Sequence, residues 1–223
     1  MKTLAIVLLL VAGVAAAPFA RQSGGLTGVV GNWSAVNDGG AALRVDGAAW
    51  NGLVDTTALA ATARRLFGAP APDFVKNNSG SGSFPIAVHE STPTFANGTL
   101  RVKFKLVGGA SDQYAGVMFG LKPDGSYQYI RYNTKDGNVS LWKYENGARV
   151  VVKHGDVHVQ LPLGTWQELV VSVAGTTARG WIAGQDSIRV EHTLTGPLSG
   201  RVGLQVKRDA VTHFRDFQLT AAR

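Results

Sequence analysis

The chain has 223 residues, with 22 basic and 15 acidic side chains, 28 glycines and no cysteine. The lack of cysteine excludes a disulfide scaffold, a thiolate zinc site and a cysteine nucleophile. An apolar fraction of 45% excludes bulk disorder, and many glycines with only 17% charged residues favour a turn-rich β protein over a helical bundle.

The first segment has the pattern of an export signal. Lys2 precedes an apolar run from Leu4 to Ala17 that ends in small residues. This run is shorter than the roughly 20 helical residues that cross a bilayer. We therefore predict a signal peptide over residues 1–17, no membrane span, and a secreted or periplasmic protein.

Residues 18–223 are predicted to form one β-rich domain. Turn pairs such as Asp124-Gly125 and Asp136-Gly137 separate short runs that alternate between apolar and polar residues. Strands are predicted at 41–46, 84–89, 99–107, 114–121, 127–133, 138–145, 148–153, 166–174, 177–183, 187–193, 201–206 and 212–219.

One segment departs from this pattern. Residues 56–67 are rich in alanine and leucine and are followed by Gly68, which predicts a single helix. The stretch after it, with Pro70, Pro72 and a run of Asn, Ser and Gly, is predicted to be a flexible loop. The fold class is therefore all-β, a two-sheet antiparallel sandwich or jelly roll with one short helical insert.

The run at 99–107 carries a basic stripe of Arg101, Lys103 and Lys105. Such a stripe attracts anionic partners, but no nucleic-acid-binding motif accompanies it. We predict a solvated sheet face and no nucleic-acid partner, with an acidic polysaccharide or an envelope surface as the alternative.

The run from 127 to 145 predicts a hairpin in which Asn133 pairs with Asn138. Antiparallel pairing then places five large side chains on one face: Tyr127, Tyr129, Arg131, Trp142 and Tyr144. Small residues of the preceding strand, Gly116 and Gly120 among them, join this face. Aromatic rings and an arginine suit a sugar, so these five are the candidate ligand-binding residues for an oligo- or polysaccharide. The alternative is that the aromatic pairs only stabilise the sheet, by about 0.2–1 kcal/mol each.

Four segments resemble the concanavalin A-like lectin/glucanase superfamily: LFGAPAPDFVKNNSGSGSFPIAV, FANGTLRVKFKLVGGASDQYAGVMFGLKPDGSYQYIRYNTKDGNVSLWKY, TWQELVVSV and SGRVGLQVKRDAVTHFRDFQL. Within it, they are similar to laminin-G-like secreted domains and to the 3-keto-disaccharide hydrolase family. The resemblance extends from about Gly31 onward and implies a concanavalin A-like sandwich. It leaves the activity open, because the superfamily includes lectins, glucanases and adhesive modules.

The resemblance also directs attention to candidate catalytic residues. Retaining glucanases of this superfamily carry an E-x-D-x-E strand, whereas the four glutamates of this chain are isolated from one another. Asp209, Asp216 and the nearby His213 lie in the closing segment that carries the resemblance and are the candidate catalytic residues. The alternative is that Asp209 caps a loop and Asp216 pairs with a neighbouring cation.

Other chemistries find little support. The chain contains no P-loop, no nucleophile elbow and no H-E-x-x-H motif. His154 and His158 are predicted to be solvated loop residues. Gly108-Gly109 and Asp112 suggest a calcium-binding loop of the kind that some laminin-G relatives carry. A single carboxylate, however, supplies few of the oxygen ligands that calcium needs. We expect no cofactor, with calcium at Asp112 as the alternative.

Three functions remain open, and the sequence does not indicate an oligomeric state. The leading hypothesis is a secreted carbohydrate-binding module, and the sequence leaves open whether the protein is an enzyme. The alternative is a hydrolase of the 3-keto-disaccharide type, which two carboxylates beside the aromatic face would favour. The third is an envelope structural or adhesive module, which would expose a large apolar patch and lack a sugar-sized cleft.

Overall fold

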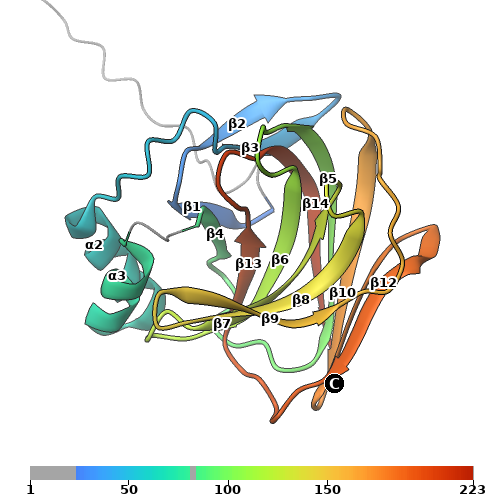
Figure 1. The fold of residues 1–223 in the computed structure, drawn as a ribbon. Helices are drawn as coiled ribbons and strands as arrows, with labels where there is room; N and C mark the ends of the chain where they lie inside the picture. Colours follow the sequence, from blue (N-terminus) through green and yellow to red (C-terminus); the bar gives the residue numbers. More distant parts are fainter. Residues whose placement is uncertain (1–23, 81–83, 223) are drawn as a thin grey trace, which may run out of the picture.

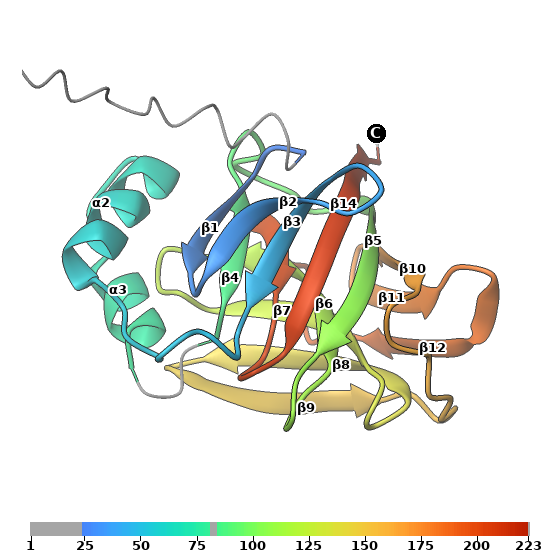
Figure 2. The same ribbon diagram turned by 90° about the horizontal axis from the view of Figure 1, so that it is seen from above.

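A computed structural model describes residues 24–80 and 84–222, so the predicted signal peptide lies outside the described residues. The described chain forms two antiparallel sheets of seven strands each, packed as two layers (Figures 1 and 2). We call them sheet A and sheet B. The predicted all-β sandwich is confirmed.

The spatial order of the strands differs from their order along the chain. From one edge to the other, sheet A consists of β1 (Leu26–Val30), β4 (Ile86–His89), β13 (Arg201–Gln205), β6 (Tyr114–Leu121), β7 (Tyr127–Asn133), β8 (Asn138–Glu145) and β9 (Ala148–His154). Sheet B consists of β12 (Gln185–Thr193), β11 (Thr177–Ile182), β10 (Trp166–Ala174), β5 (Gly98–Gly108), β14 (Val211–Ala221), β3 (Ala41–Asp46) and β2 (Trp33–Asn37).

All twelve predicted strands are present, and two more were missed. The missed strands, β1 and β2, each form an edge of a sheet and pair with β4 and β3 respectively. Their sequences, LTGVV and WSAVN, are only five residues long. Such short edge strands carry too little alternation to be recognised from sequence.

Strand β5 confirms the predicted alternation. The four alternating apolar side chains of residues 100–106 are at most 2% exposed, and the basic side chains between them point outward. Each basic residue meets a carboxylate: Arg101 pairs with Glu168 at 2.7 Å, Lys103 with Asp216 at 2.8 Å, and Lys105 with Asp38. The stripe is therefore an ion-paired sheet face, and its charge gives no support to an anionic partner.

The predicted helix is α2 (Thr56–Phe67), and its ends follow from its flanking residues. The Asp55 side chain accepts hydrogen bonds from the backbone N–H groups of Thr57 (2.9 Å) and Ala58 (3.0 Å). Gly68 ends the helix in the left-handed conformation, at φ 72°.

A second helix, α3 (Pro72–Asn78), occupies part of the predicted flexible loop, so that prediction was wrong. Pro72 fits the first helical turn, which has no need of its missing N–H, and Phe74 is completely buried. The two helices lie beside one another at one side of the sandwich (Figures 1 and 2). Arg201 of β13 attaches α2 to sheet A by donating to the backbone oxygens of Leu66 and Glu90.

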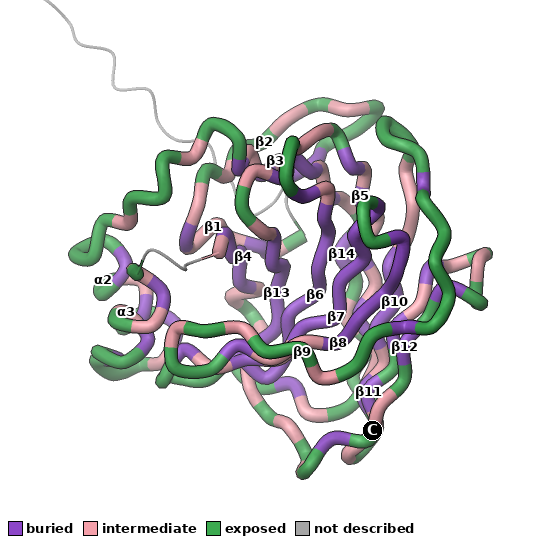
Figure 3. Tube along the Cα trace, viewed as in Figure 1, coloured by how far each residue is buried: buried purple, intermediate pink, exposed green. Residues whose placement is uncertain are grey.

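The core fills the space between the sheets (Figure 3). The rings of Phe104 in sheet B and Tyr132 in sheet A lie 6.1 Å apart. At Gly180, an added Cβ would lie 2.4 Å from a methyl carbon of Ile130, so the sheets pack closely only because this residue is glycine. None of the helices among the described residues is both long and apolar enough to cross a membrane.

Candidate functional site

The site is built on the β7–β8 hairpin, whose predicted register is confirmed. Asn133 lies opposite Asn138, and the pairing continues to Tyr127 opposite Tyr144. The hairpin turns at Gly137, which adopts φ 69° and donates its N–H to the Asn133 carbonyl at 2.8 Å. The five predicted ligand-binding side chains therefore share the outer face of sheet A, away from the core between the sheets.

Three of the five side chains, all tyrosines, are buried and do not line an opening of the surface, so their exposure gives no support to the prediction that they contact a ligand. Tyr127, Tyr129 and Tyr144 are at most 3% exposed. The Tyr144 hydroxyl donates to the Asn77 carbonyl of α3 at 2.6 Å, and the Phe84 ring packs edge-on against Tyr144. The missed helix and the segment after it thus cover this end of the face.

Burial also fixes the chemistry of these tyrosines. It raises the pKa of Tyr144 to about 12 and raises the pKa values of Tyr127 and Tyr129 as well. The rings of Tyr127 and Tyr144 stack at 5.0 Å. The covered end is a neutral aromatic cluster, an arrangement in keeping with the alternative that these aromatic pairs stabilise the sheet.

The other end of the same face is an open pocket of about 630 Å³. Arg131 and Trp142, the two remaining predicted residues, line it. The full lining consists of Ser111, Asp112, Tyr114, Arg131, Asn133, Asp136, Asn138, Trp142, Arg149, His154, His158, Lys207 and Arg208.

Arg131 is held at the base of the pocket by its own hairpin. Its Nη1 donates to the Asn138 side-chain oxygen at 2.9 Å and to the Asn138 carbonyl at 3.1 Å, and its Nη2 pairs with Asp136 at 2.7 Å. The guanidinium lies 5.7 Å from the centre of the Trp142 ring. The arginine is 2% exposed, so its position is set before any ligand arrives.

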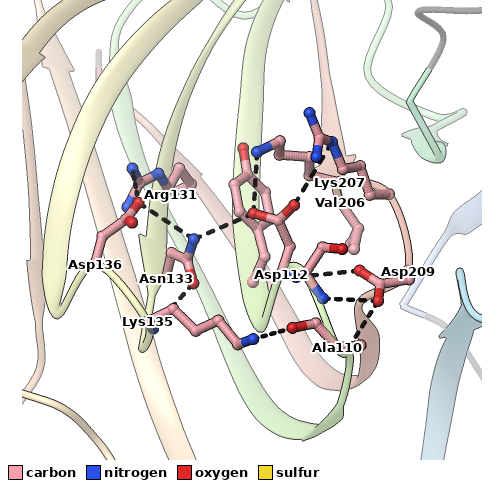
Figure 4. Close-up of polar contacts among 12 residues, drawn as sticks. Ala110, Asp112, Arg131, Asn133, Lys135, Asp136, Val206, Lys207 and Asp209 are labelled. Carbon is pink, nitrogen blue, oxygen red and sulfur yellow. Dashed lines mark hydrogen bonds and ion pairs between the residues drawn. The ribbon is translucent and has the colours of Figure 1, made fainter.

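A chain of polar contacts crosses the pocket from Arg131 to Lys207 (Figure 4). The Asn133 amide donates to Asp136 at 3.2 Å and to Asp112 at 3.3 Å, so it joins the two carboxylates. Asp112 in turn pairs with Lys207 at 3.0 Å. Along these contacts the order is a cation, a carboxylate, the Asn133 amide, a second carboxylate and a second cation.

Asp209 fixes the loop that carries Asp112. Its carboxylate accepts the backbone N–H groups of Ala110 (2.7 Å), Ser111 (2.8 Å) and Asp112 (3.1 Å). Partial burial acts to raise the pKa of Asp209, but these three hydrogen bonds outweigh it and hold the pKa below its usual value. Asp209 is not among the lining residues, and the loop-capping alternative describes it.

The other two candidate catalytic residues lie on β14 in sheet B. Asp216 pairs with Lys103 at 2.8 Å, as the alternative prediction held, and adopts φ 54° where the pairing of β14 with β5 shifts register. His213 contacts Asp38 at 2.6 Å through Nδ1. Asp216 and His213 do not line the pocket, and Asp209 adjoins it only through the backbone of the loop that it fixes.

Ten of the thirteen lining residues were not expected as site residues from the sequence, and five of these ten have basic or imidazole side chains. His154 belongs to β9 and not to a loop; its Nδ1 lies 3.0 Å from the Ser140 hydroxyl, and its ring contacts the edge of Trp142. His158 Nδ1 lies 2.9 Å from the Asp136 carbonyl. The other three are Arg149, Lys207 and Arg208. Lys207 and Arg208 reach the pocket because β13 pairs with β6, a contact between distant parts of the chain.

The carboxylate of Asp112 does not fit a calcium site. It is 5% exposed and faces Lys207 at 3.0 Å and Arg208 at 3.9 Å, so its charge is already balanced by cations. Among residues 24–80 and 84–222 there is no group of three or more His, Cys, Asp or Glu that could hold a metal ion.

The surroundings of Lys207 shift the pKa of its amine. Burial lowers the pKa of its amine below the usual value; the Asp112 carboxylate opposes this shift, and the nearby Arg149 and Arg208 add to it. The pocket thus offers an amine of lowered pKa, two carboxylates, two imidazoles and a buried guanidinium. These groups can bind hydroxyl or carbonyl oxygens and can transfer protons.

Comparison with solved structures identifies the architecture. Carbohydrate-binding module CBM66 from Bacillus subtilis superposes with a TM-score of 0.61 at 16% identity, over 88% of this chain and 96% of that chain. The Bacillus licheniformis β-glucanase (TM-score 0.44, 14% identity, 62% and 71% covered) and the Caenorhabditis elegans galectin LEC-6 (0.43, 12%, 58% and 91%) are more distant. No curated protein sequence matches the chain.

The sequence itself carries the family assignment. A family model described as the 3-keto-alpha-glucoside-1,2-lyase-like domain matches residues 32–220, which include every strand from β2 to β13 and the whole pocket. The sequence resemblance to the 3-keto-disaccharide hydrolase family is therefore confirmed, and this chain belongs to the family of 3-keto-alpha-glucoside-1,2-lyase-like domains.

Proposed function

We propose that this protein binds a saccharide in the pocket beside Arg131 and Trp142. The observation that carries the proposal is the pairing, in one hollow of about 630 Å³, of an aromatic wall with a pre-ordered polar network. Small-ligand pockets have volumes of roughly 300–1,000 Å³ and combine apolar surface with a few fixed polar groups. A sugar presents both kinds of surface.

Three lining residues also carry polar atoms that are buried and unsatisfied. Asp112 Oδ2, Arg131 Nε and Trp142 Nε1 have no hydrogen-bond partner among the described residues. A buried polar atom without a partner is costly, so a ligand hydroxyl that reached one of these atoms would relieve that cost. The likeness in fold to CBM66, which is named as a carbohydrate-binding module, is in keeping with this use of the sandwich.

Calorimetric titration with a panel of neutral oligosaccharides tests the proposal. Trp142→Ala should abolish the binding that the unaltered protein shows. The matched control is Trp181→Ala, because Trp181 is also partly exposed but lies on β11 in sheet B. Equal binding by both variants, or no binding of any sugar by the unaltered protein, would contradict the proposal.

A second function, cleavage of a 3-keto glucoside by 1,2-elimination, is favoured by the family assignment and by the two carboxylates of the pocket. A base would remove the proton on C2, which the neighbouring ketone acidifies. Its electron pair would form the C1=C2 bond as the C1–O bond breaks, and the departing oxygen would take up a proton. Asp112 is the candidate base, and Lys207 and Arg131, which line the same pocket, are the candidate groups to stabilise the enolate oxygen.

Incubation with a 3-keto glucoside and mass spectrometry of the products tests this second function. Asp112→Asn should remove product formation, whereas Asp216→Asn should preserve it, because Asp216 is a surface residue of sheet B. No product from the unaltered protein would leave saccharide binding as the only function proposed for the pocket.

We also propose that the protein acts outside the cytoplasm, on the basis of the apolar run from Leu4 to Ala17. Deleting residues 1–17 should retain the protein in the cytoplasm. Cell fractionation with an antibody measures this, and export of the shortened chain would contradict it.

A further inference from the structure

The pocket carries more positive than negative charge. Its lining includes four basic side chains, Arg131, Arg149, Lys207 and Arg208, but only two carboxylates, Asp112 and Asp136. Arg131 pairs with Asp136, and Lys207 pairs with Asp112. With neutral histidines, four cations minus two carboxylates leave a surplus of two positive charges.

The surplus is localised on Arg149 and Arg208. Arg149 forms no ion pair with any described residue, and its guanidinium lies 4.8 Å from the centre of the Trp142 ring. The acidic contact of Arg208 is a long one, 3.9 Å to Asp112, whose other oxygen already binds Lys207. Both arginines are near enough to the Lys207 amine to lower its pKa by charge repulsion.

The backbone at Arg208 indicates that this placement is built into the fold. Arg208 adopts φ 48°, in the left-handed region that favours glycine. Its carbonyl would lie 2.1 Å from a Cβ added at Gly47, so a neighbouring loop is packed against this conformation. Strained non-glycine conformations persist where the surrounding structure holds them, and they gather at binding sites.

We infer that the saccharide bound here is anionic and that Arg149 and Arg208 bind its acidic group. The inference rests on the proposed function and specifies the class of sugar. Arginine binds carboxylates and sulfate oxygens through paired, charge-assisted hydrogen bonds, and two arginines without full carboxylate partners beside Trp142 provide such donors. A uronate or a sulfated sugar would supply the missing negative charge, while its ring contacts the tryptophan.

Matched pairs of sugars test this inference by calorimetric titration. The first pair is a glucose-containing disaccharide and its glucuronate counterpart, and the second is glucose and glucose 6-sulfate. Comparing the two pairs distinguishes a carboxylate from a sulfate as the source of the negative charge. We expect the acidic member to bind about 10-fold more tightly or better, the order of one charge-assisted contact. The preference should fall as NaCl rises, because both arginines are at least partly exposed.

Variants locate the effect. The double variant Arg149→Gln and Arg208→Gln should reduce the ratio of the two affinities to near one. Arg179→Gln, an exposed arginine on β11 in sheet B, is the matched control and should leave the ratio unchanged. Thermal unfolding of each variant confirms that it is folded, and Arg149→Lys with Arg208→Lys should restore part of the preference.

The outcomes separate this inference from the proposed function. Equal binding of acidic and neutral sugars would overturn the anionic ligand and leave saccharide binding intact. A preference that survives in the double glutamine variant, or one that Arg179→Gln also removes, would overturn the role of the two arginines. Failure of the unaltered protein to bind any sugar would overturn both proposals.

Discussion

The outer face of sheet A has two ends made by the same two strands, and they differ in what lies over them. At one end Tyr127 and Tyr144 are stacked and covered by α3 and Phe84. At the other end Arg131 and Trp142 border an open pocket. The difference shows that alternation assigns a residue to a face, whereas a distant segment decides whether that face meets solvent.

The covered end should contribute most to stability. Tyr144→Ala removes a ring that packs against two other aromatic residues, and we expect the free energy of unfolding to fall by about 3–5 kcal/mol. Tyr144→Phe removes only the hydrogen bond to Asn77 and should cost about 1 kcal/mol. Urea denaturation measures both. Equal losses would mean that packing at this end matters less than the hydroxyl.

The pocket end should depend on the shape of one arginine. Arg131→Lys keeps the charge but cannot reproduce the fork that joins Asn138 and Asp136. We expect a loss of roughly 1.5–3 kcal/mol in stability and weaker saccharide binding. Urea denaturation and calorimetric titration measure these changes. Unaltered binding would show that the pre-ordered guanidinium does not contact the ligand.

The loop that carries Asp112 should respond to pH through Asp209. Because the pKa of Asp209 is lowered in the folded state, its stabilising effect is present above the unfolded pKa of about 4 and is lost as pH falls through the folded pKa. Asp209→Asn should lower the free energy of unfolding by about 1 kcal/mol at pH 7, which is the usual effect of losing a capping carboxylate. The difference between variant and unaltered protein should shrink below about pH 4. Urea denaturation at pH 7 and at pH 3 checks this, and a difference that grows in acid would reverse the assigned sign.

The smallest effect should come from sheet B. Lys103 and Asp216 are 44% and 47% exposed, so their ion pair should contribute less than about 1 kcal/mol. Lys103→Gln should leave both the unfolding midpoint and saccharide binding nearly unchanged. A large loss of saccharide binding would indicate that the outer face of sheet B takes part in binding.

The fold class and the hairpin register could be predicted because both depend on local pattern. Turn pairs and alternation set the strands, and the pairing of Asn133 with Asn138 followed from the short loop between them. Helix α3 escaped prediction because it is seven residues long and rich in turn-forming residues. Because this helix was not predicted, the covering of Tyr127 and Tyr144 could not be predicted either.

The pocket could be predicted only in part, because most of its lining is nonlocal. Arg131 and Trp142 were found from alternation. Lys207 and Arg208 follow a strand that pairs with β6, more than 80 residues earlier in the chain, and no local pattern records that pairing. Asp209 drew attention as a candidate catalyst, and its real contacts are three backbone N–H groups of a distant loop.

The most direct test of saccharide binding in the pocket is an NMR titration with a saccharide that binds in the calorimetric experiments. The titration follows the indole N–H signals of the five tryptophans as this saccharide is added. We predict that the Trp142 signal shifts to saturation, with backbone amides from Asn133 to Asn138, while the signal of Trp181 in sheet B stays in place. Shifts confined to Trp181, or to α3 above the covered tyrosines, would contradict the assignment of the pocket as the binding site.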